Sequence, residues 1–249
     1  MVVAVVLASV VIDAQAKGPT PALPTQRPSP DARMMQGLIV DWGGVLTMPI
    51  HIAIGSWLKS TGVDHNHYGE VVRRWVEPLP GEISPVHRLE RGELAVEDFE
   101  HLLSAALERE GSRVEAQGLV GKMFADLAIY EDSMTSLVTR ARSAGIRTAL
   151  LSNSWGNQYD RSDWHEMFDT VVISGEVGMR KPERGIFELV LHRIGLPADE
   201  CVLIDDMAHN IVAAEQAGLV GIVHRSFDET ATELTALFPG AAWIHQRLH

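Results

Sequence analysis

The sequence predicts an α/β fold, in which a doubly wound parallel sheet carries helices on both faces and receives an all-helical insertion near its start. Two observations predict the sheet. Five short apolar runs lack the alternation of half-exposed strands, and amphipathic helical patterns precede three of them. A third observation predicts the insertion, because strand-like runs disappear between residues 50 and 130 while helical patterns continue.

The five apolar runs are the predicted strands. Each is short, continuous and bounded by residues typical of turns, as expected of strands buried on both faces of a parallel sheet. In chain order they are GLIVD (37–41), RTALLS (147–152), TVVIS (170–174), CVLID (201–205) and VGIVH (220–224).

Helices are predicted at 131–145, 183–195 and 210–218, and each of these segments ends in glycine, a common residue at helix C-termini. Within the insertion, the segment 96–110 has apolar residues at helical spacing and Glu97 in its first turn, where a carboxylate is favourable.

The predicted organisation has three parts. Residues 1–35 form a disordered or proline-rich extension, residues 36–49 and 131–249 form the sheet domain, and residues 50–130 form the helical insertion. The extension begins with an apolar run similar to a signal peptide, but no basic residue precedes that run. Five prolines follow, and we hypothesise that translation starts at Met34 or Met35.

Composition narrows the functional classes. The net charge is −12, from 21 basic and 33 acidic residues, and no cluster of basic residues is present. A nucleic-acid surface and tight docking on an anionic membrane are therefore not expected. We predict a cytoplasmic protein, monomeric or homodimeric. The single cysteine, Cys201, lies in an apolar run and is expected to be a buried small hydrophobe.

Polar residues gather where the predicted strands end. Asp41, Ser152 with Asn153, and Asp205 with Asp206 end three of the apolar runs, and Lys181 stands between the run at 170–174 and the next helix. Ligands of open α/β sheets bind at the carboxyl ends of strands, so these side chains are expected to converge on one crevice.

The converging set has a coherent chemistry. Carboxylates suit Mg²⁺, and serine, asparagine and lysine side chains can hold phosphoryl oxygens. A strand-end aspartate can act as the nucleophile that accepts a phosphoryl group. Gly43 and Gly44, which follow Asp41, allow the backbone to turn sharply and approach a ligand closely.

Four motifs in the same order resemble those of the haloacid dehalogenase-like hydrolase superfamily. They are LIVDWGGVLT, ALLSNS, GMRKPERGIF and VLIDDMAHN, and together they cover roughly residues 37–225. HRLERGELAVEDFEHLL, in the insertion, is similar to the helical cap of the subgroup that includes the phosphatase domain of soluble epoxide hydrolase. The resemblance implies a Rossmann-like core and a helical cap that closes over the site.

The resemblance also implies a role for each motif residue. Asp41 would attack phosphorus, and Ser152 and Lys181 would hold the transferring phosphoryl group. Mg²⁺ would be bound by Asp41, the carbonyl of Gly43 and Asp206, and by Asp205 either directly or through water. Asn153, Trp155 and Gly44 are predicted to contact the substrate, a small phosphorylated molecule.

Gly43 departs from the pattern, because most phosphatases of this superfamily have a second aspartate at that position as general acid and base. Four interpretations stay open. In order of preference, they are a Mg²⁺-dependent phosphatase of small phosphate monoesters, a catalytically silent binding protein, a phosphonate hydrolase and a carbon–halogen hydrolase. His51 and His165 are weak candidates to replace the missing acid.

Overall fold

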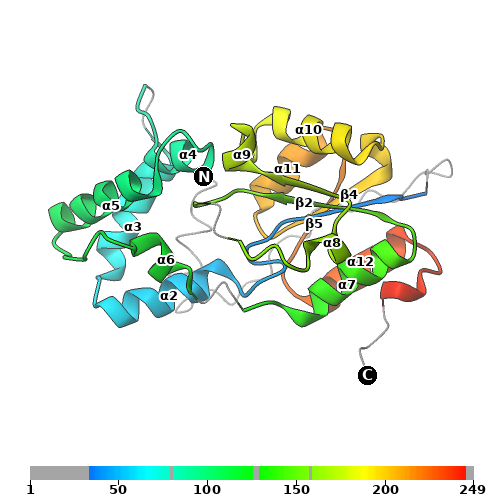
Figure 1. The fold of residues 1–249 in the computed structure, drawn as a ribbon, viewed down its shortest axis with the longest axis horizontal. Helices are drawn as coiled ribbons and strands as arrows, with labels where there is room; N and C mark the ends of the chain where they lie inside the picture. The colour runs from blue at the N-terminus through cyan, green and yellow to red at the C-terminus, as the bar shows by residue number, and fades with distance from the viewer. Residues whose placement is uncertain (1–33, 79–80, 126–128, 157–158, 245–249) are drawn as a thin grey trace, which may run out of the picture.

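The computed structural model describes residues 34–78, 81–125, 129–156 and 159–244. Within these ranges the chain forms a sheet with its covering helices, and a helical lobe beside it, as Figure 1 shows. The predicted extension, residues 1–35, lies outside the described residues except for Met34 and Met35. No helix in the described ranges has the length and apolar character needed to cross a membrane.

The sheet is parallel and has the strand order β3-β2-β1-β4-β5. All five predicted strands are confirmed, to within one residue at their ends. Their bounds are β1 (Gly37–Val40), β2 (Arg147–Ser152), β3 (Thr170–Ile173), β4 (Cys201–Asp205) and β5 (Val220–Val223). Strand β1 lies in the middle of the order, so the residue that follows it is flanked by the ends of β2 and β4.

Helices cover both faces of this sheet, as the doubly wound prediction requires (Figure 1). Leu38 and Val40 of β1 pack in the apolar cluster on one face, and Ile39 packs in the cluster on the other. The first face carries α7 (Asp132–Ser143), α8 (Trp164–Met167), α12 (Phe227–Leu237) and the 3-10 helix η3 (Ala242–Ile244). The second carries α10 (Arg184–Ile194) and α11 (Ala208–Gln216), and the short elements α9 (Ser174–Val177) and η2 (Ala198–Glu200) follow β3 and α10.

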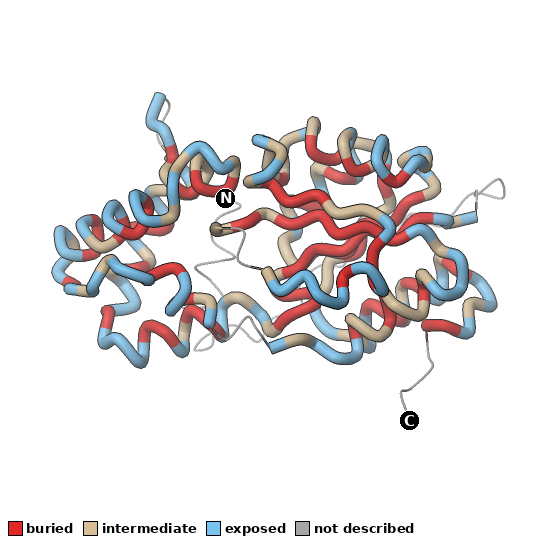
Figure 2. The backbone as a smooth tube through the Cα atoms, viewed as in Figure 1, coloured by how far each residue is buried: buried red, intermediate tan, exposed pale blue. Residues whose placement is uncertain are grey.

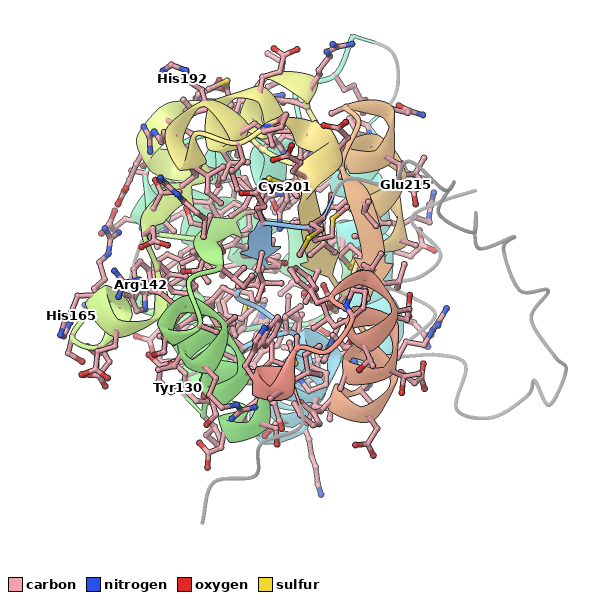
Figure 3. The ribbon with its side chains drawn as sticks, turned by 90° about the vertical axis from the view of Figure 1, so that its right-hand side faces the viewer. Tyr130, Arg142, His165, His192, Cys201 and Glu215 are labelled. Atoms are coloured by element: carbon pink, nitrogen blue, oxygen red, sulfur yellow. The ribbon has the colours of Figure 1, made fainter. Side chains whose placement is uncertain are left out.

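Burial explains why the strands are apolar throughout. Three residues of β1 and all five of β4 have no exposed surface, because the helical layers exclude water from both sides (Figure 2). Cys201 is fully buried among these residues, as Figure 3 shows, and burial raises the pKa of its thiol to about 12. The expectation of a buried cysteine is confirmed.

The helical lobe has an apolar core of its own, in which residues such as Leu58, Phe99 and Leu107 are buried. Its helices are α2 (Ile50–Thr61), α3 (His65–Val76), α4 (Pro85–Glu90), α5 (Val96–Glu110) and α6 (Leu119–Met123). The predicted helix at 96–110 is confirmed as α5. Glu100 of α5 is buried and accepts bonds from the Gly118 and Val120 amides, so it satisfies N–H groups at the start of α6.

Candidate active site

The ends of three neighbouring strands place the predicted polar residues together. Asp41 follows β1, Ser152 ends β2, and Asp205 and Asp206 end β4. Because β2, β1 and β4 are adjacent and parallel, their carboxyl ends open at one edge of the sheet. Oxygen atoms of Asp41, Asp205 and Asp206 lie within 4.8 Å of one another.

Lys181 joins two of these carboxylates. Its side chain has no exposed surface, and Nζ lies 2.9 Å from Asp41 Oδ1 and 2.6 Å from Asp205 Oδ2. Burial lowers the pKa of Lys181, but the two carboxylates outweigh burial, so the net shift of the pKa is upward. The lysine is therefore a fixed cation at the site.

Asp205 uses both carboxylate oxygens within the protein. Oδ1 accepts bonds from the Met207 amide at 2.8 Å and from Asn210 Nδ2 at 3.0 Å. Oδ2 accepts from Lys181 Nζ, and also from Asn210 Nδ2 at 3.1 Å. A carboxylate engaged by three donor groups orients Lys181 and has little capacity left for a further ligand.

Asp206 differs from its neighbour. Its Oδ1 atom is buried and has no hydrogen-bond partner among the described residues. Burial, together with Asp41 and Asp205, raises the pKa of Asp206 to about 8. Burial also raises the pKa of Asp41, to about 6, although Lys181 opposes the shift. A buried carboxylate oxygen without a partner, beside two other carboxylates, is costly unless a cation offsets it, so the donor set fits a hard divalent metal ion.

Gly44 allows the loop that follows β1 to approach Asp206 closely. Its φ angle is +77°, and a Cβ atom there would lie 2.5 Å from Asp206 Oδ2. Both the backbone conformation and the missing side chain are therefore required. At Gly43 a Cβ would lie 3.0 Å from Ile50 Cδ1, so Ile50 occupies the space that a side chain at position 43 would enter.

The predicted phosphoryl-binding residues are fixed by neighbours. Ser152 Oγ lies 3.0 Å from the Tyr159 hydroxyl. Asn153 exchanges two hydrogen bonds with the backbone of Lys181, at 2.8 and 3.0 Å, and so connects the end of β2 to the lysine loop. Sequence reasoning assigned no role to Tyr159 or Asn210, although both lie near their partners in the chain. Asn210 ends the fourth motif, VLIDDMAHN, and that position was the available signal, whereas Tyr159 belongs to none of the four motifs.

A cavity of about 590 Å³ extends from these groups into the helical lobe. Residues Asp41, Ser152, Asn153, Lys181 and Asp206 line its sheet end. Gly43 and Trp155 also line it, and contact of Trp155 with a substrate stays a prediction. His51 lines the cavity, whereas His165 lies at the outer surface on α8 and is exposed (Figure 3).

Two ion pairs join the lobe to the sheet domain. Glu90, at the end of α4, pairs with Arg180, and its other oxygen accepts a bond from Trp155 Nε1 at 3.2 Å. Arg91 donates from Nε to Glu183 Oε1 at 2.8 Å. Glu90 and Arg180 are nearly buried, with 10% and 12% of their side chains exposed. We call these two ion pairs, Glu90–Arg180 and Arg91–Glu183, the interdomain pairs.

Comparison with known proteins agrees with this geometry. The sequence model of the haloacid dehalogenase-like hydrolases matches residues 35–218. The chain belongs to that family. The match covers the four strand-end motifs and the helical insertion between the first two of them.

Individual relatives are more distant. A sesquiterpene phosphatase of Aspergillus oryzae is 28% identical over 157 residues, which cover 60% of this chain and 77% of the relative. Acyl-CoA dehydrogenase family member 10 of the mouse is 27% identical over 212 residues, and this chain spans 19% of that longer protein. Among solved structures, a HAD family enzyme of Bacteroides thetaiotaomicron, in complex with magnesium and inorganic phosphate, has a TM-score of 0.56 at 20% identity, over 77% of this chain and 94% of that one.

Proposed function

We propose that this hydrolase is a Mg²⁺-dependent phosphatase that acts on a small phosphate monoester through an aspartyl-phosphate at Asp41. The observation that carries the proposal is the contact between a buried lysine and the strand-end carboxylate, beside a second carboxylate that has a free buried oxygen. The similarity to a fungal sesquiterpene phosphatase supports a phosphate ester as substrate.

Asp41 is the proposed nucleophile. Its Oδ1 atom accepts the bonds from Lys181 Nζ and from the Trp42 amide, at 2.9 and 2.7 Å, which orients Oδ2 for attack on phosphorus. The ester P–O bond breaks, the alcohol leaves, and the phosphoryl group is carried by the carboxylate. Water then attacks phosphorus, releases inorganic phosphate and restores Asp41.

Lys181 and Ser152 are proposed to bind the oxygens of the transferring group. Lys181 is held in place by Asp205, and Ser152 by Tyr159, so neither needs to reorganise when charge develops. Asn153 is proposed to keep the lysine loop in register through its two backbone bonds.

Asp41, Asp206 and the carbonyl of Gly43 would hold the magnesium ion, which when bound neutralises charge on the phosphoryl oxygens. Because Asp205 is occupied by three donors, we assign it to positioning Lys181, or to the metal only through water. Gly44 is assigned to accommodating Asp206, and its contact with substrate stays a prediction.

The glycine at position 43 determines which group can protonate the leaving oxygen. No carboxylate follows Asp41 at that position, and Ile50 fills the adjacent space, so the leaving oxygen takes its proton from water or from His51.

The alternative interpretation as a phosphonate hydrolase requires a lysine in the lobe. Lys59 and Lys122 are both exposed and neither lines the cavity, so we do not favour that reaction.

The test is phosphate release from acetyl phosphate and phenyl phosphate, with and without Mg²⁺, by wild type and Asp41→Asn. We expect Mg²⁺-dependent turnover that Asp41→Asn reduces by about 10³-fold or more. Asp228→Asn, at an exposed residue of α12 outside the carboxylate cluster and the cavity wall, is the control and should keep the wild-type rate. Turnover that survives Asp41→Asn would contradict the proposal.

A further inference from the structure

The part of the cavity that extends into the lobe is lined mainly by apolar side chains, with His51, Tyr68 and Glu90 as the exceptions, although it opens onto the charged end of the sheet. Four helices (α2, α3, α4 and α6) and the segment after α6 contribute aliphatic or aromatic side chains to its wall, namely Ile54, Val72, Val76, Val86, Val120 and Phe124. Four of these six are buried, so the wall is built into the core of the lobe rather than formed by surface residues.

Trp155 extends this apolar wall from the sheet domain. The residue follows β2, and its ring packs edge-on against Phe99 and Phe124 at centroid distances of 5.1 and 5.3 Å. Its indole nitrogen donates to Glu90, so its polar atom already has a partner. The tryptophan therefore offers an apolar face to the cavity, next to the position where the phosphoryl group would sit.

Two of the charged residues that line the cavity beside the apolar wall are engaged with each other. Glu90 and Arg180 line the cavity, but they form an ion pair and Glu90 also accepts the Trp155 bond. His209 lines the sheet end, and burial lowers its pKa, which keeps the imidazole neutral near pH 7. A substrate rich in hydroxyl groups would lose bonds to water here without gaining equivalent partners on the apolar wall.

We propose that the substrate is the phosphate monoester of an apolar alcohol, with its hydrocarbon part lying in the lobe between Val72, Val120 and Trp155. This inference rests on the proposed phosphatase function and names its substrate class. A volume of about 590 Å³ lies in the range of pockets that enclose a drug-sized ligand, and exceeds what a two-carbon ester would fill. The phosphate binds at the charged end, and burial of the hydrocarbon supplies the specificity.

The test measures kcat/KM for straight-chain alkyl phosphates from ethyl to decyl, with acetyl phosphate as the minimal substrate. The alkyl esters share one leaving-group chemistry, so chain length changes only contacts with the cavity. We expect kcat/KM to rise by about threefold to fourfold per methylene until the cavity is full. A sugar phosphate of similar size should fall about 10²-fold below the best alkyl ester.

Two matched variants test whether the dependence on chain length arises at the cavity wall. Val76→Phe enlarges a half-buried residue on the cavity wall and should move the optimum to shorter chains. Leu102→Phe makes a similar enlargement on the exposed surface of α5 and should leave the chain-length profile as in wild type. Thermal unfolding of both variants checks that each is folded.

The outcomes separate this inference from the proposed function. Turnover of acetyl phosphate with no dependence on chain length would overturn the apolar substrate and leave the phosphatase intact. If no ester is hydrolysed, the phosphatase proposal fails. Calorimetric binding of ethylphosphonate and decylphosphonate with Mg²⁺ then decides the inference. Affinity that rises with chain length supports an apolar phosphate ligand, and equal affinities overturn it.

Discussion

The strand ends and the lobe form opposite walls of one cavity, and they are built in opposite ways. At the strand ends Asp41, Lys181 and Asp205 form a chain of contacts no longer than 2.9 Å. In the lobe the wall consists of aliphatic and aromatic side chains that belong to an apolar core. Directional bonds hold a reacting group at one position, whereas an apolar wall selects by size and accepts many shapes.

The difference indicates that the two regions have different roles. The charged cluster depends on a few atoms, so a single substitution there should remove activity. The lobe distributes its contribution over many contacts, so single substitutions should change substrate preference and leave the chemistry intact. The interdomain pairs connect the two regions, and their removal should have an intermediate effect.

The largest expected effect comes from removing the central cation. Lys181→Met would leave Asp41 and Asp205 facing each other without a buried positive charge. We expect kcat to fall by about 10³-fold or more and the free energy of unfolding to fall by about 3–5 kcal/mol, as measured by phosphate release and urea denaturation.

The control for this prediction is Lys122→Met, which removes an exposed lysine of the lobe. It should change the free energy of unfolding by no more than about 1 kcal/mol. Similar losses in the two lysine variants would show that the buried contacts have no special role.

The second prediction concerns the glycine beside Asp206. Gly44→Ala places a Cβ 2.5 Å from Asp206 Oδ2 and forces alanine to φ +77°. We expect a loss of about 10²-fold in kcat, because the carboxylate must move, and a loss of about 1–3 kcal/mol in the free energy of unfolding.

Gly62→Ala is the matched control, since Gly62 has a φ of +72° but nothing within 4 Å of an added Cβ. It should lower the free energy of unfolding by about 1 kcal/mol, because of the backbone conformation alone, and its turnover should equal that of wild type. Loss of activity in Gly62→Ala, or full activity in Gly44→Ala, would refute the role of this contact.

The third prediction addresses the contact between the two regions. Glu90→Gln breaks the pair with Arg180 and leaves a nearly buried guanidinium without its anion. We expect a loss of about 1–3 kcal/mol in the free energy of unfolding and about a tenfold increase in KM for decyl phosphate, with little change in kcat.

Glu188→Gln breaks the exposed pair with Arg184 on α10 and serves as its control, with an expected loss below about 1 kcal/mol. A fall in kcat as large as that of Lys181→Met would place Glu90 in the chemical step, contrary to our assignment.

The last prediction is a pH dependence of metal binding, measured through the stability of the protein. Burial and neighbouring carboxylates raise the pKa of Asp206 from 3.8 to about 8 in the metal-free protein. A raised carboxyl pKa gives stability that is complete below the ordinary pKa and is lost as the pH rises through about 8. Mg²⁺ competes with that proton, so it should stabilise the protein more at about pH 9 than at about pH 5, by up to about 3 kcal/mol at saturation.

Thermal unfolding at both pH values with and without Mg²⁺ measures this difference. Asp206→Asn should make the response to Mg²⁺ smaller and less dependent on pH, with the remaining dependence due to Asp41, whose pKa is raised to about 6. An equal stabilisation of wild type at the two pH values would mean that Asp206 does not bind the ion.

The sequence predicted the sheet and the charged residues at the ends of its strands. Strands β1 to β5 were predicted from continuous apolar runs, and Asp41, Ser152 and Asp205 from their positions at the ends of those runs. Both signals are local, because burial on two faces requires apolar residues and a parallel sheet brings its strand ends to one edge.

The apolar wall had no comparable signal. Val72, Val120 and Phe124 lie on or beside different helices and were indistinguishable in sequence from the residues of the lobe core. The same holds for Glu90, which resembles any helical glutamate until α4 packs against the loop that carries Arg180. Position 43 is a third case, since the glycine was visible but Ile50 filling its space was not.

The sequence by itself therefore determined the α/β class, the order of the motifs and the acidic and basic groups of the site. Only the tertiary structure decided that Asp205 is occupied by Lys181 and Asn210, that Asp206 retains a free buried oxygen, and that an apolar cavity faces them. The physical reason is that periodicity and strand ends are properties of neighbouring residues. The partner of a buried atom and the shape of a cavity depend instead on segments that meet only when the chain has folded.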